Sequence, residues 1–118
     1  MPGPCVVCLP TYNEKENLER MVHAIGEAAP GVRVLVIDDN SPDGTGAIAD
    51  RLAQELPYVE VLHRAKKEGL GPAYLAGFRH ALGLGAELIV EMDCDFSHDP
   101  KALPSLIAAA ERADLVLG

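Results

Sequence analysis

The chain has 118 residues, of which 48% are hydrophobic and 24% charged, and its formal net charge is −8 at pH 7. These values indicate one globular domain over residues 1–118 and argue against a nucleic-acid-binding protein, because phosphate recognition needs clustered Lys and Arg. The sequence contains no apolar stretch of roughly 20 residues and no secretory signal pattern. We therefore expect a cytoplasmic protein without a transmembrane segment, and peripheral contact with the inner face of the membrane stays open.

The three cysteines, Cys5, Cys8 and Cys94, do not suggest a disulfide framework. Cys5 and Cys8 have the C-x-x-C spacing of some redox and zinc sites, but the sequence has no second cysteine pair to complete a zinc site. They lie in an apolar run, where a strand would direct them to opposite faces. We predict that both are small buried hydrophobic residues.

Apolar strand-like runs alternate with helical patterns from one end of the chain to the other. A strand is predicted over residues 5–9, and Asn13 with Glu16 has the spacing of a capping box at the start of a helix. That helix has one apolar face, formed by Leu18, Met21, Val22 and Ile25.

The pattern continues with three more strand–helix units. Polar loops or turns separate the elements, and Asp43 is interpreted as a turn residue that holds Gly44 and the start of the next helix. The expected inward residues are Ile48, Leu52 and Leu56 in one helix and Leu75, Phe78 and Leu82 in the next. The predicted elements are strand 33–38, helix 45–56, strand 59–63, helix 72–84, strand 87–92, a helix that opens at Asp99-Pro100, and a strand from 115.

Strands that alternate with helices predict an α/β fold with a mostly parallel sheet and helices on both faces. The usual strand order, 3-2-1-4, places the fourth strand beside the first, and ligands bind beyond the carboxyl ends of the strands. That order would bring three polar segments into one crevice. They are residues 10–14, Asp38-Asp39 and residues 93–95.

Two carboxylates, Asp93 and Asp95, follow the apolar run 88–90 with one residue between them. Carboxylate oxygens suit hard cations such as Mg²⁺ or Mn²⁺, and such an ion can neutralise a diphosphate as it leaves. This D-x-D motif is common in acidic loops. It becomes specific here because Asp38-Asp39 and the loop over residues 10–14 accompany it. Taken alone, Asp38-Asp39 could instead simply cap a turn before Pro42.

Four motifs together resemble the N-terminal part of a GT-A glycosyltransferase of family 2. Within that family the chain is most similar to the polyprenol (dolichol) phosphate mannosyltransferases of the bacterial branch, and the resemblance covers essentially the whole chain. It implies a Rossmann-like nucleotide-sugar-binding fold that is incomplete at the C-terminus. The motifs are residues 9–14 (LPTYNE), residues 38–45 (DDNSPDGT), residues 69–71 (GLG) with Ala73-Tyr74, and residues 92–95 (MDCD) with Ser97-His98.

The resemblance implies a role for each matching residue. Tyr12 would pack against the base or ribose, Asp39 would accept a hydrogen bond from the base, and Asp93 and Asp95 would be the catalytic residues. Arg64, Lys66 and Lys67 match no such role, and we interpret them as a solvated basic loop, with contact to phosphate or anionic lipid left open. The implied nucleotide-sugar contacts are Pro10, Tyr12, Glu14, Ile37, Asp39, Asp93 and Cys94, and the implied metal ligands are Asp93, Asp95 and Ser97.

The implied reaction is metal-dependent, inverting transfer of mannose from GDP-mannose to a polyprenyl phosphate, with Mg²⁺ or Mn²⁺ as cofactor. Pro42 favours the mannosyl branch over relatives that use UDP-glucose. Proteins of this family continue past the fifth strand into an acceptor-binding region, so we expect this chain to supply the donor site. A UDP-sugar-dependent enzyme and a non-catalytic nucleotide-binding fragment remain alternatives, and a homo-oligomer or a membrane-anchoring partner stays open.

A phosphoacceptor receiver domain is an alternative from another class, because it has a similar length and an acidic Mg²⁺ pocket. Its acidic pair should follow the first strand, where this chain instead has residues 10–14. His98 lies close to Asp95 in sequence and could reach a metal, but we expect it to position the loop.

Overall fold

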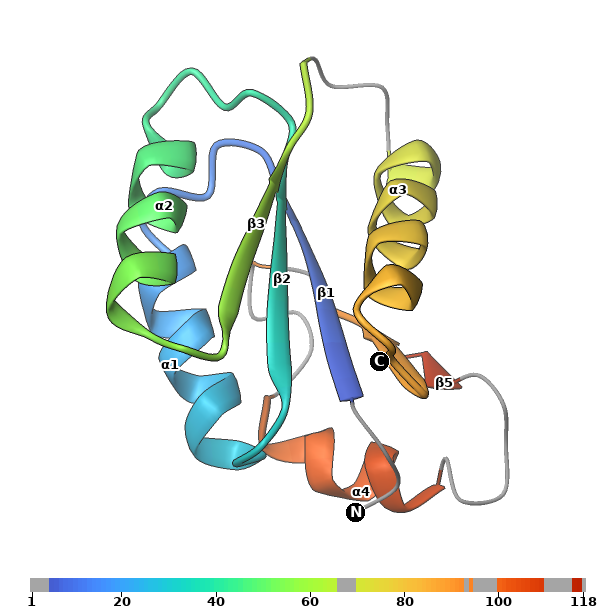
Figure 1. Ribbon diagram of the computed structural model, residues 1–118. Helices are drawn as coiled ribbons and strands as arrows, with labels where there is room; N and C mark the ends of the chain where they lie inside the picture. Colours follow the sequence, from blue (N-terminus) through green and yellow to red (C-terminus); the bar gives the residue numbers. More distant parts are fainter. Residues whose placement is uncertain (1–4, 66–69, 93, 95–99, 110–115, 118) are drawn as a thin grey trace.

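The computed structural model describes residues 5–65, 70–92, 94, 100–109 and 116–117. Within these residues a parallel five-stranded sheet has the order β3-β2-β1-β4-β5, which confirms the predicted neighbours of the first four strands (Figure 1). The elements are β1 (Cys5–Thr11), α1 (Leu18–Ala28), β2 (Arg33–Asp38), α2 (Thr45–Glu55), β3 (Val59–His63), α3 (Leu70–Gly83), β4 (Leu88–Glu91), the 3₁₀ helix η1 (Pro100–Ala102), α4 (Leu103–Ala109) and β5 (Val116–Leu117).

Helices cover both faces of the sheet. Helices α1, α2 and α4 pack on one face and α3 packs on the other (Figure 1). The central strand β1 is buried along its whole length. Its alternate residues Cys5, Val7 and Leu9 belong to the first of these cores, while Val6 and Cys8 belong to the second, as the two-residue period of a strand requires.

The cysteines of β1 are free, buried and on opposite faces, as predicted. Burial raises the pKa of the Cys5 thiol to about 11. Burial, and then the nearby Glu91 and Cys5, raise the pKa of Cys8 to about 12. Because the thiolate is the form that reacts and binds metals, both thiols are inert at neutral pH. The redox and zinc interpretations of the C-x-x-C spacing therefore have no support.

The predicted capping box at the start of the first helix is wrong. Helix α1 begins at Leu18, and its N-cap residue Asn17 makes no capping bond through its side chain. Asn13 instead has a φ of 56°, in the left-handed region, and the carbonyl of Glu14 accepts hydrogen bonds from the amides of Asn17 and Leu18. The predicted apolar face of this helix is correct, because Leu18, Met21, Val22 and Ile25 are all buried.

The predicted inward face of α3 is partly wrong. Phe78 packs partly buried against the core, but Leu75 and Leu82 are 51% and 63% exposed. The residues that face the sheet are small instead, namely Ala73, Gly77 and Ala81. The helix therefore lies too close to the sheet for leucine side chains, and the small residues at i, i+4 and i+8 permit this approach.

Substitution of Gly77 by Ala is expected to lower the free energy of unfolding by about 1–3 kcal/mol, because overpacking forces a well-packed core to shift. A Cβ atom at Gly77 would lie 2.4 Å from Cδ1 of Ile37, which is itself fully buried. Urea unfolding of the two proteins measures the difference. Gly83→Ala on the same helix is the matched control, because a Cβ there has no atom within 4 Å. Equal midpoints for both variants would contradict this account of how α3 packs.

Candidate functional site

The carboxyl ends of β1 and β2 meet at one edge of the sheet, where the 10–14 loop begins (Figure 1). Thr11 is in register with Asp38, and the Thr11 carbonyl accepts a hydrogen bond of 3.2 Å from the amide of Asp39. On the other side of β1, the amide of Met92 donates to the carbonyl of Cys8 at 3.1 Å. The topology therefore brings the 10–14 loop beside Asp38 and Asp39, as predicted, while residues 93 and 95 of the third predicted segment lie outside the described residues.

The predicted nucleotide-sugar residues occupy different depths at this edge. Pro10 and Ile37 are buried register partners in β1 and β2, while Tyr12 and Glu14 are half-buried just beyond β1. Asp39 is 6% exposed and follows the end of β2. Cys94 is 2% exposed and its side chain belongs to the core on the α1 side, so we expect its predicted contact to come from the backbone.

The predicted metal ligands Asp93, Asp95 and Ser97 lie outside the described residues, as does His98. Over the part of the chain that the structure describes, no group of three or more His, Cys, Asp or Glu side chains is arranged to hold a metal ion. Among the described helices, none has the length and apolar character needed to cross a membrane.

Asp38 organises the loops at this edge, and its bonds to Ser41 confirm the turn-capping interpretation of Asp38. Asp38 is 2% exposed, and its carboxylate accepts three hydrogen bonds. The Thr11 hydroxyl donates to Oδ1 at 3.0 Å, the Ser41 hydroxyl donates to the same oxygen at 2.6 Å, and the Ser41 amide donates to Oδ2 at 3.1 Å. Asp38 therefore ties the end of β1 to the loop after β2. A serine three residues after an aspartate is a known turn pattern, whereas the bond to Thr11 had no signal in the local sequence.

The segment over residues 41–45, here called the 41–45 loop, holds the 10–14 loop in place. Three successive backbone amides, those of residues 13–15, donate to side chains of this segment. Such bonds fix the backbone that follows Tyr12 and includes Glu14. The pairs are the Asn13 amide with Ser41 Oγ at 3.0 Å, the Glu14 amide with Thr45 Oγ1 at 3.0 Å, and the Lys15 amide with Asp43 Oδ2 at 3.2 Å.

These three hydrogen bonds between the two loops, here called the clamp, explain why the predicted capping box does not form. In a helix that starts at Asn13, the amides of residues 13–15 would be available to the helix's own capping residues. Here these amides donate to side chains of the 41–45 loop instead. Asn13 is then free to adopt its left-handed conformation, which asparagine tolerates better than most residues. A tertiary contact has therefore replaced a local one.

Asp43 is a turn residue, as predicted, and it also belongs to the clamp. Its Oδ1 accepts the Thr45 amide at 3.0 Å and the Thr45 hydroxyl, and Gly44 between them has a φ of 94°. Desolvation raises the pKa of Asp43, but hydrogen bonds from the Thr45 side chain and amide and from the Lys15 amide outweigh it, so the pKa is lowered overall. The ionised carboxylate is thus the form that the clamp favours.

A shallow depression of about 380 Å³ borders the clamp. It is lined by residues 13–17 and Asp43, so Glu14 is the residue of the predicted nucleotide-sugar set that it contains. The depression lies where the two loops meet the start of α1.

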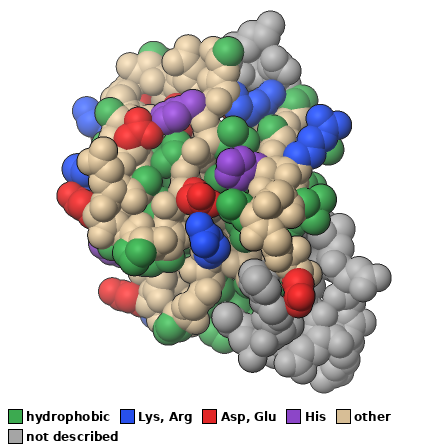
Figure 2. All heavy atoms as spheres, viewed as in Figure 1, with side chains coloured by type: hydrophobic (Ala, Val, Ile, Leu, Met, Phe, Trp, Pro, Cys, Tyr) green, Lys and Arg blue, Asp and Glu red, His purple; other side chains and the backbone are tan. Residues whose placement is uncertain are grey.

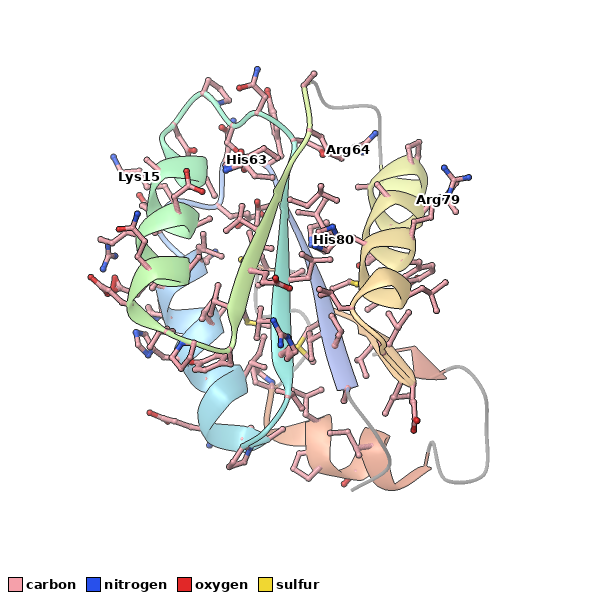
Figure 3. The ribbon with its side chains drawn as sticks, in the orientation of Figure 1. Lys15, His63, Arg64, Arg79 and His80 are labelled. Carbon is pink, nitrogen blue, oxygen red and sulfur yellow. The ribbon has the colours of Figure 1, made fainter. Side chains whose placement is uncertain are left out.

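Arg64 corrects the prediction of a solvated basic loop. Its guanidinium Nη1 lies 3.4 Å from Oδ1 of Asp39, and the two side chains are 14% and 8% exposed. Lys66 and Lys67 lie outside the described residues. Arg64 directly follows β3, at the carboxyl edge of the sheet (Figure 3). The face drawn in Figure 2 mixes acidic, basic and hydrophobic side chains, and Arg64 is distinguished by its partner rather than by surrounding charge.

The sequence is similar to known proteins over most of its length. Residues 6–118 match the family described as Glycosyl transferase family 2. The chain is 54% identical over 110 residues to the undecaprenyl-phosphate mannosyltransferase of Micrococcus luteus, covering 93% of this chain and 45% of that protein. It is 52% identical over 115 residues to the polyprenol monophosphomannose synthase of Mycolicibacterium smegmatis, covering 96% and 43% respectively. The chain therefore spans less than half the length of these two relatives.

Solved structures share the fold. The mannosyltransferase PcManGT from Pyrobaculum calidifontis, in complex with GDP-Man and Mn²⁺, superposes with a TM-score of 0.68 at 28% identity, covering 77% of this chain and 27% of that one. Staphylococcus aureus TarS 1–349 superposes with a TM-score of 0.73 at 20% identity, covering 92% and 32%, and shows the fold alone. The predicted GT-A architecture is confirmed, and the chain belongs to glycosyl transferase family 2.

Proposed function

We propose that this chain forms the donor site of an enzyme that transfers mannose, with inversion, from GDP-mannose to a polyprenyl phosphate. The observation that carries the proposal is the meeting of the 10–14 loop and Asp39 at one edge of the sheet, where Asp39 is tied to Thr11 by a backbone bond. The names of the two bacterial relatives and the GDP-Man bound to PcManGT favour mannose as the sugar.

The nucleoside would bind between the 10–14 loop and the end of β2. Tyr12 would supply an aromatic face for the base or ribose, with Glu14 beside it. Asp39 would accept hydrogen bonds from N1–H and the exocyclic amine of guanine, which are adjacent donors that match the two oxygens of a carboxylate. Pro10 and Ile37, buried below, would form the floor, and the backbone of Cys94 would complete the pocket.

The diphosphate would bind at the D-x-D motif. Asp93, Asp95 and Ser97 offer the oxygen ligands that Mg²⁺ or Mn²⁺ prefers. A bound cation would neutralise the charge on the departing diphosphate. Because the phosphate acceptor is already anionic, the chain's main tasks would be to position the donor and stabilise the leaving group, and a strong base would be unnecessary. The lipid acceptor would place the reaction at a membrane surface.

Calorimetric titration of GDP and UDP, each with Mn²⁺ and with a chelator, tests this proposal. We expect tighter binding of GDP than of UDP, and tighter binding with Mn²⁺ than with chelator. Asp95→Asn should reduce the affinity measured in Mn²⁺ to the level measured with chelator. Asp50→Asn is the matched control, because Asp50 is an exposed carboxylate on α2 that pairs with His63. A preference for UDP would replace the sugar assignment, and absence of binding to either nucleotide would refute the proposed donor site.

A further inference from the structure

We propose that Arg64 is a positioning residue for base recognition, in that it fixes the orientation of the Asp39 carboxylate. This inference rests on the proposed function, because it assumes that Asp39 contacts the base. The Arg64 guanidinium lies 3.4 Å from Oδ1 of Asp39, in a pair whose side chains are 14% and 8% exposed.

The two backbones of this pair are held independently of the side-chain contact. The amide of Arg64 donates to the carbonyl of Asp38 at 2.8 Å, which continues the pairing of β2 with β3. The side chain of Asn40 donates to the carbonyl of Ala65 at 3.1 Å, so the segments that follow both strands are tied together. The guanidinium therefore approaches Asp39 from a backbone segment that is already held in place.

Fixed backbones do not fix the plane of the carboxylate. The terminal torsion of an aspartate side chain is broad and roughly two-fold, so the plane is set by whatever its oxygens contact. To bind both adjacent donors of guanine, the carboxylate must lie in the plane of the base. A planar guanidinium has directional N–H groups and can impose such an orientation, whereas a lysine ammonium acts as a point charge.

The simpler alternative is that Arg64 only neutralises a carboxylate that is nearly buried. Such a carboxylate needs a partner, and a buried ion pair by itself is weak evidence for a further role. The two explanations differ in what lysine can replace. Lysine supplies the charge and would satisfy the neutralising role, but it lacks the planar donor fork and would not restore the orientation.

Comparison of GDP with inosine diphosphate (IDP) isolates the orientation of Asp39. The two nucleotides differ in the exocyclic amine of the base, so changes elsewhere in the pocket affect both equally. We expect the unmodified chain to bind GDP about tenfold more tightly than IDP. When IDP is bound, one oxygen of the Asp39 carboxylate would have no donor from the base. In Arg64→Lys we expect this ratio to fall below about threefold while the urea midpoint stays close to that of the unmodified chain.

The controls separate the possible outcomes. Arg51→Lys should leave the GDP-to-IDP ratio unchanged, because Arg51 is an exposed residue of α2 that pairs with Glu19 of α1 and Glu55 of α2. In an Asp39→Ala background, Arg64→Lys should have no further effect on the ratio, since coupled residues are not additive. A GDP-to-IDP ratio that is the same in Arg64→Lys and the unmodified chain would overturn this inference alone. If the unmodified chain bound neither nucleotide, the donor-site proposal would fall with it.

Discussion

Replacement of Asp38 by Ala is expected to lower the free energy of unfolding by about 3 kcal/mol or more, a large share of the stability of a small domain. Asp38 is 2% exposed, and its carboxylate accepts hydrogen bonds from the Thr11 hydroxyl and from the hydroxyl and amide of Ser41. Alanine would remove the acceptor of the buried Thr11 hydroxyl and of the partly buried Ser41 hydroxyl and amide. Urea unfolding followed by circular dichroism measures the loss.

Two further variants show whether the loss arises from this network. Asp50→Ala removes an exposed carboxylate that pairs with His63, and we expect a change of at most about 1 kcal/mol. Ser41→Ala keeps Asp38 but removes the hydroxyl that links its carboxylate to the Asn13 amide. We expect Ser41→Ala to reduce the free energy of GDP binding by more than it reduces the free energy of unfolding. An Asp38→Ala protein as stable as the Asp50→Ala control would show that the network contributes little.

Substitution of Asp39 by Asn is expected to change which purine the chain prefers. GDP should bind about 10- to 100-fold more weakly, equivalent to about 1.4 to 2.7 kcal/mol, because the asparagine amide would face the exocyclic amine of guanine, donor against donor. Xanthosine diphosphate carries a carbonyl acceptor at that position, so it should bind more tightly to the variant than GDP does. Titration of both nucleotides into both proteins measures the exchange.

A reversal of preference is a demanding test because general damage to the pocket would weaken both nucleotides. Asp43→Asn is a useful comparison, since Asp43 belongs to the clamp and not to the proposed base contact. That variant should lower the affinities for GDP and xanthosine diphosphate by the same factor. If Asp39→Asn also lowered both affinities equally, Asp39 would not read the edge of the base.

The neighbouring residues Asp38 and Asp39 thus have separate roles despite identical side chains. Asp38 is the last residue of β2 and Asp39 is the first residue after it, and their carboxylates contact different partners. Asp38 points toward the start of α2, where a Cβ added at Gly46 would lie 3.0 Å from its Oδ2. Asp39 instead meets Arg64. The first carboxylate shapes the loops, and the second is the one that we propose contacts the base.

Much of the fold could be predicted because its signals are local. The strands at 33–38 and 59–63 have the predicted bounds, and the apolar face of α1 follows from its 3.6-residue period. The strand order followed from alternation of strands and helices, which leaves few topologies. The order in turn predicted that the 10–14 loop would lie beside Asp39.

The errors occurred where the partner of a residue is distant in sequence. Asn13 has a local capping pattern, but its amide donates to Ser41. Leu75 and Leu82 have the spacing of an inward face, but α3 lies against Ile37 at a distance that only small side chains permit. Arg64 reads as a solvated cation until β3 places it beside Asp39.

The amino-acid sequence is thus sufficient to specify the elements, their order and the family motifs, since periodicity and turn chemistry act between residues a few positions apart. The depth at which α3 packs, the clamp on the 10–14 loop and the pairing of Arg64 with Asp39 depend on the folded molecule. Each arises because a buried polar group or a packed side chain interacts with residues that are close in space. Those residues are distant in sequence and become neighbours only when the chain folds.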